Sequence, residues 1–389
     1  GSPMTGKPLR FMAIHELYLR SFRNYGEERL EFDPGVNLIV GRNAQGKTNL
    51  LEAVAYLGSG RSFRAQRSAE MIGFGADFAE LDGGITAQDR EQRIRWLLFP
   101  GSRPRQLTVN GVKKKTAAAL AGLLPTVLFC PEDLLILKTG ASARRRFADN
   151  ALCQLRPNYD AALGEYNRVL DQKSRILKDW HDRPALLDVL PEFDRRLCRV
   201  GAILISYRAR FFDALGKAAG EYHGSFSGGR EDFRLEYKTV SNIPDPFAPV
   251  TELEEKLNEH LERHHRAELD SGQCLTGPHK DDFEITLSGI NLKLYGSQGQ
   301  TRTAAISLKL AQRELMRREW GQEPVLLLDD VLSELDADRQ DFVLNQIVKG
   351  QVFITCCEPG RFTKLGRTME IREGTLLLPP FGVVPRAAN

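Results

Sequence analysis

The sequence lacks any apolar run of the length that a membrane-spanning helix needs, so a protein anchored in a membrane by such helices is not indicated. Cysteine is scarce, and none of the six cysteines forms a Cys-x-x-Cys pair. Neither a zinc site nor a disulfide framework is therefore predicted, and we expect reduced thiols in a cytoplasmic protein.

The sequence also has little excess charge of either sign, with a formal net charge of +3. Such a small excess permits nucleic-acid binding without arguing for it, because what matters is whether the positive charges are clustered. Internal repeats, low-complexity tracts and long heptad runs are absent as well, which excludes a long coiled-coil arm.

What remains is an ordinary globular composition, 42% hydrophobic and 27% charged, in a chain long enough for two lobes. Short apolar runs between turn signals predict strands at 11–19, 28–32, 36–40, 93–99, 106–109, 127–129, 233–237, 283–287, 325–328 and 351–355. Helical spacing predicts helices at 49–57, 251–269, 304–319 and 338–348, and several antiparallel helices within 141–221. For the helix at 251–269, Thr251 and Glu254 have the spacing of a capping box.

One segment matches the phosphate-binding pattern G-x-x-x-x-G-K-[ST] in full, between a predicted strand and a predicted helix. The glycines permit turns that aim successive N–H groups at phosphate oxygens, and the helix N-terminus adds partial positive charge. Lys47 can reach the β- and γ-phosphates, and the Thr48 hydroxyl can bind Mg²⁺. The segment therefore predicts an ATP–Mg²⁺ site, made of Gly41, Arg42, Asn43, Ala44, Gln45, Gly46, Lys47, Thr48 and Asn49.

Two acidic residues follow the apolar strand predicted at 325–328. A buried strand that ends in carboxylates presents them at the sheet edge where α/β proteins bind ligands. Asp329 would hold Mg²⁺, and Asp330 would polarise the attacking water. Taken alone the pattern is weak, since a strand followed by two aspartates is common; the phosphate-binding loop gives it weight.

Two further short segments accompany these motifs. The stretch Ser297, Gln298, Gly299 and Gln300 precedes a predicted helix, so it is either an anion site or an ordinary N-terminal cap. Ser333 and Asp336 follow the double aspartate, and Thr355 ends the next predicted strand.

In this order, these elements resemble the ATP-binding-cassette superfamily. The resemblance implies a P-loop α/β head with a largely helical lobe inserted into it. It also implies a dimer in which the signature, residues 297–300, closes over the ATP of the other subunit. Ser333 and Asp336 would lie in the D-loop, and Thr355 would join Lys47, Asp329 and Asp330 as the switch residue. Most members have Glu and His where this chain has Asp330 and Thr355, so slow hydrolysis is expected.

Longer stretches resemble one branch of this superfamily, the RecF family of bacterial recombination proteins. These stretches are residues 19–25, 43–53, 60–64, 131–134, 144–147, 277–282 and 328–336. The resemblance implies an ATP-dependent homodimer on double-stranded and gapped DNA, partnership with RecR, and help in loading RecA on gaps coated with SSB. The corresponding division of the chain is a head in two parts, 4–140 and 271–389, with a helical lobe at 141–270.

Several basic residues have two interpretations, contact with DNA phosphates or pairing and solvation on a surface. They are Arg61, Arg64, Arg67, Lys113, Lys114, Lys115, Arg144, Arg145 and Arg146. No aromatic residues are interleaved with them, so any DNA contact should be to the backbone and independent of sequence.

The histidines at 260, 264 and 265 lack a third metal ligand at a suitable spacing, and a solvated helix face is the favoured interpretation. His279 is either structural or a sensor of the interface between the lobes. Two other classes of function stay open, a transporter ATPase subunit and an ATP-dependent clamp that does not hydrolyse ATP. The long separation of Lys47 and Ser297 opposes the first.

Overall fold

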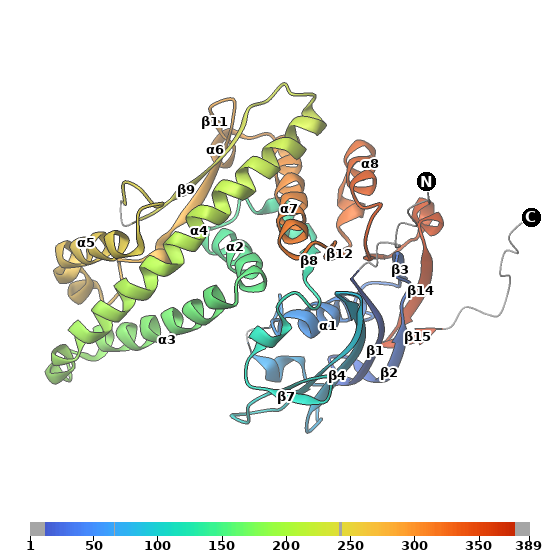
Figure 1. The fold of residues 1–389 in the computed structure, drawn as a ribbon, viewed down its shortest axis with the longest axis horizontal. Helices are drawn as coiled ribbons and strands as arrows, with labels where there is room; N and C mark the ends of the chain where they lie inside the picture. Colours follow the sequence, from blue (N-terminus) through green and yellow to red (C-terminus); the bar gives the residue numbers. More distant parts are fainter. Residues whose placement is uncertain (1–11, 66, 241–242, 378–389) are drawn as a thin grey trace, which may run out of the picture. The chain divides into compact units, whose positions relative to one another are not determined.

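The computed structural model describes residues 12–65, 67–240 and 243–377 (Figure 1). The chain forms two compact units: unit 1 combines residues 1–131 with 316–389, and unit 2 is the continuous segment 132–315. The α/β class with an inserted, largely helical lobe is confirmed. The divisions differ from the expected boundaries near 140 and 270, because residues beyond 270 pair with strands of the inserted lobe.

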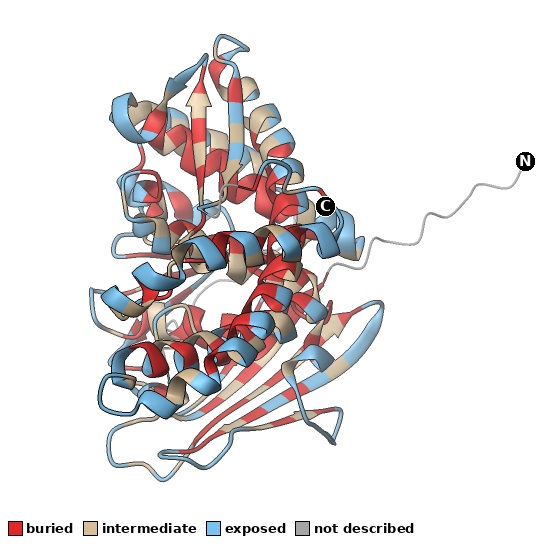
Figure 2. Cartoon of the chain, turned by 90° about the vertical axis from the view of Figure 1, so that its left-hand side faces the viewer, coloured by how far each residue is buried: buried red, intermediate tan, exposed pale blue. Residues whose placement is uncertain are grey.

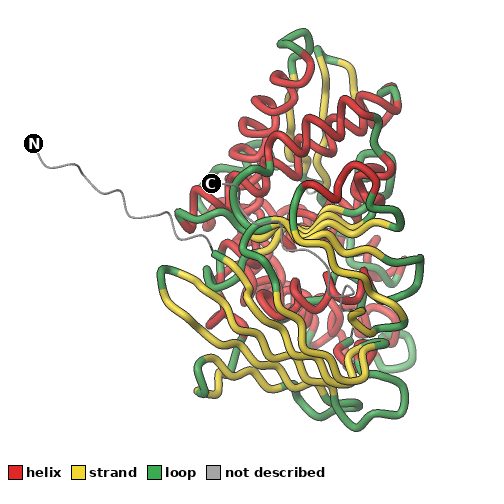
Figure 3. Tube along the Cα trace, turned by 90° about the vertical axis from the view of Figure 1, so that its right-hand side faces the viewer, coloured by secondary structure: helices red, strands yellow, loops and turns green. Residues whose placement is uncertain are grey.

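Unit 1 contains an antiparallel sheet whose strands run in the order β2-β1-β4-β5-β6-β7 (Figure 3). Burial alternates along β4, so one face of the sheet is apolar and packs inward while the other is polar. The last strand, β7, is an edge whose three residues are all exposed. The bounds are β1 (Ala13–Phe22), β2 (Tyr25–Glu31), β4 (Ala79–Ala87), β5 (Arg90–Leu98), β6 (Gln106–Val109) and β7 (Val112–Lys114).

A second sheet of unit 1 has the order β15-β14-β3-β13-β12-β8, and its neighbours are parallel except for the β14–β15 hairpin. The carboxyl ends of its parallel strands therefore meet at one edge, where open α/β sheets bind ligands. The bounds are β3 (Val36–Val40), β8 (Thr126–Phe129), β12 (Val325–Asp329), β13 (Val352–Cys356), β14 (Arg367–Arg372) and β15 (Thr375–Leu377).

Helix α1 (Lys47–Ser59) joins the two sheets into one core. Its buried Leu50 and Leu57 belong to a single apolar cluster with Leu81 of the first sheet and Phe353 of the second. Packing is close, since a Cβ at Gly58 would lie 2.1 Å from the Leu124 carbonyl oxygen. The core thus fixes the helix that follows the phosphate-binding loop. Helix α8 (Ala337–Gln346) lies further along the same unit.

Unit 2 is mainly helical, with a small sheet of order β11-β10-β9. Its long helices bury one side and expose the other, as expected for amphipathic helices (Figure 2). The last helix, α7, begins in unit 2 and ends in unit 1. The bounds are α2 (Ala141–Leu155), α3 (Pro157–Asp179), α4 (Leu190–Ser227), α5 (Val250–Ser271), α6 (Leu292–Tyr295), α7 (Gln298–Trp320), β9 (Phe233–Lys238), β10 (Asp282–Leu287) and β11 (Ile290–Asn291).

Buried ion pairs hold the helices of unit 2 in place. The Lys173 ammonium, on α3, is fully buried and lies 2.8 Å from an Asp194 carboxylate oxygen and 2.5 Å from one of Glu268. Arg208, on α4, pairs with Asp149 at 2.8 Å and donates to the Pro278 carbonyl at 2.7 Å. Since each of these buried charges has a partner, substitution of one partner would leave an unpaired buried charge, which destabilises the fold.

One expectation about local structure is wrong, strands including β4, β14 and β15 were not predicted, and α7 begins earlier than predicted. Strand β4 was not predicted, because its centre contains Gly83 and Gly84; a Cβ at Gly83 would lie 2.2 Å from Leu57, so the glycine permits close packing. Thr251 does not cap α5, which begins at Val250 after Pro249. Helix α7 begins at Gln298 rather than at 304, and residue 11 of the first predicted strand lies outside the described residues.

Within the described ranges, no helix is both long enough and apolar enough to cross a bilayer.

Candidate functional site

The phosphate-binding loop connects β3 to α1 at the carboxyl edge of the parallel sheet. Gly46 has φ 111°, and a Cβ there would lie 3.0 Å from the Asn24 side chain; a Cβ at Gly41 would lie 2.4 Å from the Ile371 carbonyl oxygen. Both positions therefore require glycine. Ala44 also has a positive φ of 62°, while Arg42 and Asn43 are exposed. The geometry agrees with the phosphate-binding loop predicted from the sequence.

Lys47 is almost fully buried at the centre of this loop. Its ammonium donates to the Gly41 carbonyl at 2.6 Å and to the Cys357 sulfur at 3.3 Å, and it lies 3.6 Å from an Asp330 oxygen. The cation is therefore aimed across the loop, within reach of a phosphate placed there.

A second network joins Thr48 to the two strands that follow in the sheet. The Thr48 hydroxyl donates to Asp329 Oδ1 at 3.1 Å, and the Thr355 hydroxyl donates to the same oxygen at 2.7 Å. The Thr355 oxygen also accepts from the Asp330 N–H at 2.9 Å. Thr355 thus fixes both aspartates, which explains a hydroxyl at the end of β13.

Thr48 and Asp329 suit a magnesium ion bound to a nucleotide. The described residues contain no group of three or more His, Cys, Asp or Glu side chains that could hold a metal ion. Mg²⁺ needs no such cage beside a phosphate, since it takes one or two protein oxygens and completes its shell with phosphate and water. The adjacent Thr48 hydroxyl and Asp329 carboxylate are hard oxygen donors of this kind.

Burial raises the pKa of Asp329, against the lowering effect of the hydrogen bonds from Thr355 and Thr48. The protonated carboxyl cannot bind Mg²⁺, so Mg²⁺-dependent nucleotide binding is expected to weaken as pH falls through this raised pKa. The effect of pH on folding stability runs in the opposite direction. The folded chain binds the Asp329 proton more tightly than the unfolded chain does, so the protonated carboxyl stabilises the fold at low pH. This stabilisation is lost as pH rises through the pKa of Asp329 in the folded chain.

The measurement is a titration of Mg²⁺ against a fluorescent ATP analogue at a series of pH values below neutrality. Asp329→Asn lacks both the titrating group and the carboxylate ligand, so it should bind Mg²⁺–nucleotide weakly throughout, without this acid-dependent loss. The same pH profile in both proteins would contradict the assignment of the proton to Asp329.

Asp330 has a backbone conformation that few residues adopt, with φ 52°. Its N–H is held by Thr355, its carbonyl accepts from the Ser333 hydroxyl at 2.6 Å, and its side chain is about one-third exposed beside Lys47. Asp336 caps α8 by accepting from the Arg339 N–H at 3.0 Å. The predicted D-loop is thus a braced turn that leads from the acids into α8.

The predicted signature segment lies at the start of α7, in unit 2, with Ser297 and Gln298 exposed and Gly299 and Gln300 half-buried. Ser297 and Gln300 form a reciprocal cap: the Ser297 hydroxyl accepts from the Gln300 N–H at 3.2 Å, and Gln300 Oε1 accepts from the Ser297 N–H at 3.1 Å. The ordinary interpretation, a helix cap, is therefore realised. It leaves an anion-binding role open, since Ser297 and Gln298 are exposed at the positive end of a 23-residue helix.

The basic candidates for DNA contact separate into two groups. Arg61, Arg64 and Arg67 are exposed after α1, and Lys113, Lys114 and Lys115 lie exposed on or just beyond the edge strand β7. Arg64 donates to the Asn49 side chain at 2.8 Å, which ties it to the first turn of α1. The lysines have the exposure that a phosphate contact needs.

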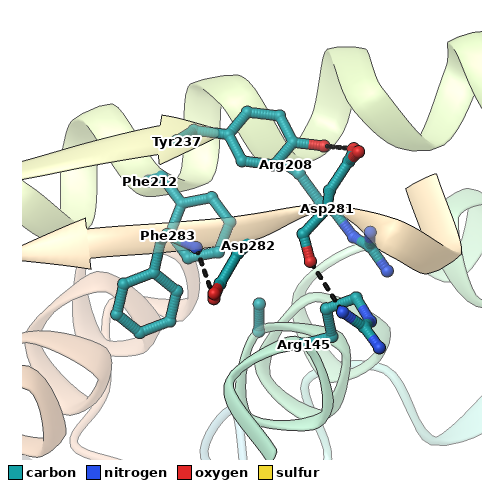
Figure 4. Close-up of a pocket in the computed structure, with 8 residues that line it drawn as sticks. Arg145, Arg208, Phe212, Tyr237, Asp281, Asp282 and Phe283 are labelled. Atoms are coloured by element: carbon teal, nitrogen blue, oxygen red, sulfur yellow. Dashed lines mark hydrogen bonds between the residues drawn. The ribbon is translucent and has the colours of Figure 1, made fainter. Parts of the chain in front are cut away.

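Arg144 does not fit this role, and its assignment as a DNA candidate is wrong. It is 1% exposed and makes a bidentate pair with Asp282, with distances of 2.6 and 2.9 Å. Arg145 is half-buried and donates to the Asp281 carbonyl at 2.8 Å, in the wall of a pocket lined also by Arg208 and Tyr237 (Figure 4). Burial lowers the pKa of Arg145 and disfavours it as a surface contact.

His260 and His279 are held by hydrogen bonds within the fold, whereas His265 is exposed, as expected. His260 is buried, not solvated as expected, because it bonds Thr276 at 2.7 Å and stacks on His264. His279 bonds the Cys274 carbonyl through Nε2 and the Tyr166 hydroxyl through Nδ1, at 3.1 and 2.7 Å. Burial lowers the pKa of His279 to about 4, so the ring is neutral near pH 7 and donates only through Nε2.

Other residues of this site were missed because they come from distant parts of the sequence. Asn24 donates to the Gln45 carbonyl at 3.2 Å and accepts from Asn49, and the Tyr25 hydroxyl donates to the Gly46 carbonyl at 2.9 Å. The Cys357 thiol donates to Asn43 at 3.0 Å. Asn24 and Tyr25 lie in a stretch that resembles the RecF family, residues 19–25, but nothing in that stretch specifies their partners.

The glutamate of α1, Glu52, was also missed as a bracing residue. It is fully buried and makes a bidentate pair with Arg23, with both distances 2.8 Å, and it accepts from Ser62 at 2.5 Å. One carboxylate therefore joins the β1–β2 hairpin, the helix of the phosphate-binding loop and the segment that follows it.

Comparisons with known proteins show which family the chain resembles. Residues 13–375 match the family described as RecF/RecN/SMC N terminal domain. The DNA replication and repair protein RecF of Acetivibrio thermocellus is 38% identical over 353 residues, which cover 90% of this chain and 95% of that protein. The protein of the same name from Agathobacter rectalis is 39% identical over 353 residues, 91% of this chain and 94% of its own length.

Solved structures of RecF proteins are also similar to this chain. The recombination mediator protein RecF-ATP in the RecFOR pathway is 33% identical, with a TM-score of 0.85 over 95% of this chain and 99% of that one. Its counterpart RecF-ATPrS has the same identity and a TM-score of 0.87 over 94% and 98%. The Smc head domain of Pyrococcus furiosus is 18% identical, covers 94% and 95% with a TM-score of 0.52, and supports the fold alone.

Proposed function

Because this chain belongs to the RecF family of DNA replication and repair proteins, within the wider RecF/RecN/SMC family, we propose that it is an ATP-dependent DNA-binding protein of recombinational repair. The observation that carries the proposal is the convergence of Lys47, Thr48, Asp329, Asp330 and Thr355 at one sheet edge. Relatives described with ATP and ATPrS support a nucleotide at this edge.

The loop N–H groups and Lys47 would bind the phosphates of ATP, with Lys47 moving from the Gly41 carbonyl onto the phosphate oxygens. Mg²⁺ held by Thr48 and Asp329 would supply charge neutralisation at those phosphates. Asp330 would orient and deprotonate the attacking water, and Thr355 would keep both acids in place. Asp330 has a shorter side chain than the glutamate that most members of the superfamily have at this position, and this difference supports slow ATP hydrolysis.

ATP would also join two copies of the chain. The exposed start of α7 directs helix N–H groups and the Ser297 hydroxyl outward, and Gly299 permits close approach. We propose that they bind the γ-phosphate of ATP held by a second copy, so that ATP stabilises the dimer and hydrolysis releases it.

DNA would be bound through its backbone, on double-stranded and gapped substrates and without sequence preference. The exposed Lys113, Lys114 and Lys115, with Arg61 and Arg64, are the candidate contacts. The name of the pathway of the similar structures, RecFOR, supports RecR as a partner. Loading of RecA on SSB-coated gaps is the outcome that we propose.

The test is fluorescence anisotropy on gapped duplex DNA at a fixed salt concentration, with and without ATP–Mg²⁺. Salt is fixed because phosphate contacts make affinity strongly dependent on ionic strength. We expect ATP–Mg²⁺ to raise DNA affinity by about 10-fold, since dimerisation doubles the contacts, and Lys47→Met to remove this gain.

Lys364→Met is the matched control, since Lys364 is an exposed lysine of the same unit. It should keep the gain. DNA affinity that does not respond to ATP in the wild-type protein would contradict the proposed mechanism, although the nucleotide site itself would remain.

A further inference from the structure

The side chain of Gln300 ties the first turn of α7 to a distant part of unit 2. Its Oε1 is already occupied as the acceptor for the Ser297 N–H. Its Nε2 is therefore directed the other way, and it donates to Glu231 Oε1 at 2.8 Å. The cap of the signature helix thus continues into a contact with a residue 69 positions away.

Glu231 lies in the short connection between α4 and β9. The chain reverses there through Gly228 and Gly229, which have φ 67° and 72°. The next residue, Asp232, is fixed to the turn between β10 and β11: its N–H donates to the Ser288 hydroxyl at 3.2 Å, and its carbonyl accepts from the Ser288 N–H at 2.8 Å. The backbone that follows Glu231 is thus anchored.

The second oxygen of Glu231 is held by a buried histidine. His223, on the last turns of α4, is fully buried, and its Nε2 lies 2.7 Å from Glu231 Oε2. Its Nδ1 has no partner among the described residues, so the Nε2–H tautomer satisfies the ring best. The ring also lies 5.4 Å from that of Phe233, which restricts its movement.

The carboxylate is therefore fully used, with one oxygen for Gln300 and one for His223. The hydrogen bond from Gln300, followed by that from His223, lowers the pKa of Glu231, so it is ionised at neutral pH. Hydrogen bonds to an ionised acceptor are stronger than neutral ones. Among the described residues Gln300 Nε2 donates to Glu231 alone, so the orientation of the Gln300 amide depends on Glu231.

We propose that Glu231 is the positioning residue of the signature: supported by His223, it fixes Gln300 and through it the Ser297 N–H and hydroxyl at the start of α7. Glu231 does not itself touch the nucleotide. This inference rests on the proposed function, in which Ser297 meets the γ-phosphate of ATP on a second copy. It assigns to the end of α4 a role in the chemistry of the dimer.

The test compares Glu231→Ala with Asp232→Ala. The control removes the same charge from the adjacent residue, whose side chain makes only an exposed pair with Arg234. The dimer dissociation constant in ATP–Mg²⁺ is measured by sedimentation, and ATP affinity of the monomer with a fluorescent analogue. Glu231→Ala should weaken the dimer roughly 30-fold, one charge-assisted bond being lost per signature, and leave monomer affinity within about 2-fold. Asp232→Ala should change neither.

A double variant separates positioning from general stability. If Glu231 acts through Gln300, Glu231→Ala combined with Gln300→Ala should be no weaker a dimer than Gln300→Ala alone. Additive losses would overturn the proposal, as would a Glu231→Ala dimer as tight as wild type. If Glu231→Ala does not fold, Glu231→Gln is measured instead. The amide oxygen of the new glutamine can still accept from Gln300, so this variant should weaken the dimer less than Gln300→Ala does. An equal loss of dimer affinity in the two variants would count against the proposal.

The failure of this inference and that of the proposed function are distinguishable. A wild-type protein that does not dimerise with ATP would remove the proposed function. A wild-type protein that dimerises, with no effect of Glu231→Ala, would remove only the role of Glu231.

Discussion

Ser297→Arg is expected to abolish ATP-dependent dimerisation while ATP still binds the monomer. The Ser297 hydroxyl is both exposed at the start of α7 and the acceptor for the Gln300 N–H. Arginine has no acceptor for this bond, and its long side chain would occupy the space in which the proposed phosphate lies. A symmetric dimer contains the defect twice, so a loss of about 2 kcal/mol at each signature weakens the dimer by roughly 1000-fold.

Sedimentation with and without ATP–Mg²⁺ measures this effect, and a fluorescent ATP analogue measures binding to the monomer. Ser142→Arg is the matched control, because Ser142 is also exposed in the first turn of a helix of unit 2. The control should dimerise as the wild type does. Intact ATP-dependent dimers in Ser297→Arg would refute a role for the signature between subunits.

Asp330→Asn is expected to slow ATP hydrolysis at least about 100-fold, the usual contribution of a general base, and to lengthen the life of the ATP-bound dimer. The substitution is conservative for the backbone, because asparagine tolerates the left-handed conformation seen at φ 52°. The bonds of its N–H to Thr355 and of its carbonyl to Ser333 are retained. Only the charge facing Lys47 is lost.

Phosphate release gives the rate, and the decay of the dimer after dilution into excess ADP gives its lifetime. Asp338→Asn, at an exposed position in the first turn of α8, is the control and should leave both unchanged. An unchanged rate in Asp330→Asn would show that another group activates the water. A lost rate with an unchanged lifetime would separate hydrolysis from dimer release.

Most of the nucleotide site could be predicted from the sequence because its signals are local. The phosphate-binding loop is a run of eight residues, and the two acids follow a strand that is apolar throughout. The structure places Lys47, Thr48 and both acids together at the sheet edge, as expected from parallel strands that end there. Their chemical roles stay predictions until they are tested.

What could not be predicted depends on pairings between distant segments. Nothing near Glu52 indicates that Arg23 is its partner, and nothing near Arg144 indicates Asp282, which is why Arg144 was misread as a surface cation. Glu231 and Gln300 lie 69 positions apart, and no local pattern indicates that their side chains meet. A run of positively charged residues in the sequence does not show which of them are buried. Arg144 is buried and Lys113 is exposed, and only the fold distinguishes them.

The order of strands around β3 has a consequence for the synthesis of the protein. β3 is made before the inserted unit, but its neighbours in the sheet, β13 and β14, are made after it. The inserted unit is continuous in the chain, whereas the sheet that carries the phosphate-binding loop must wait until β13 and β14 have been translated. A chain truncated before β13 lacks Thr355 and the sheet edge, so unfinished copies cannot assemble the site and compete for ATP or partners.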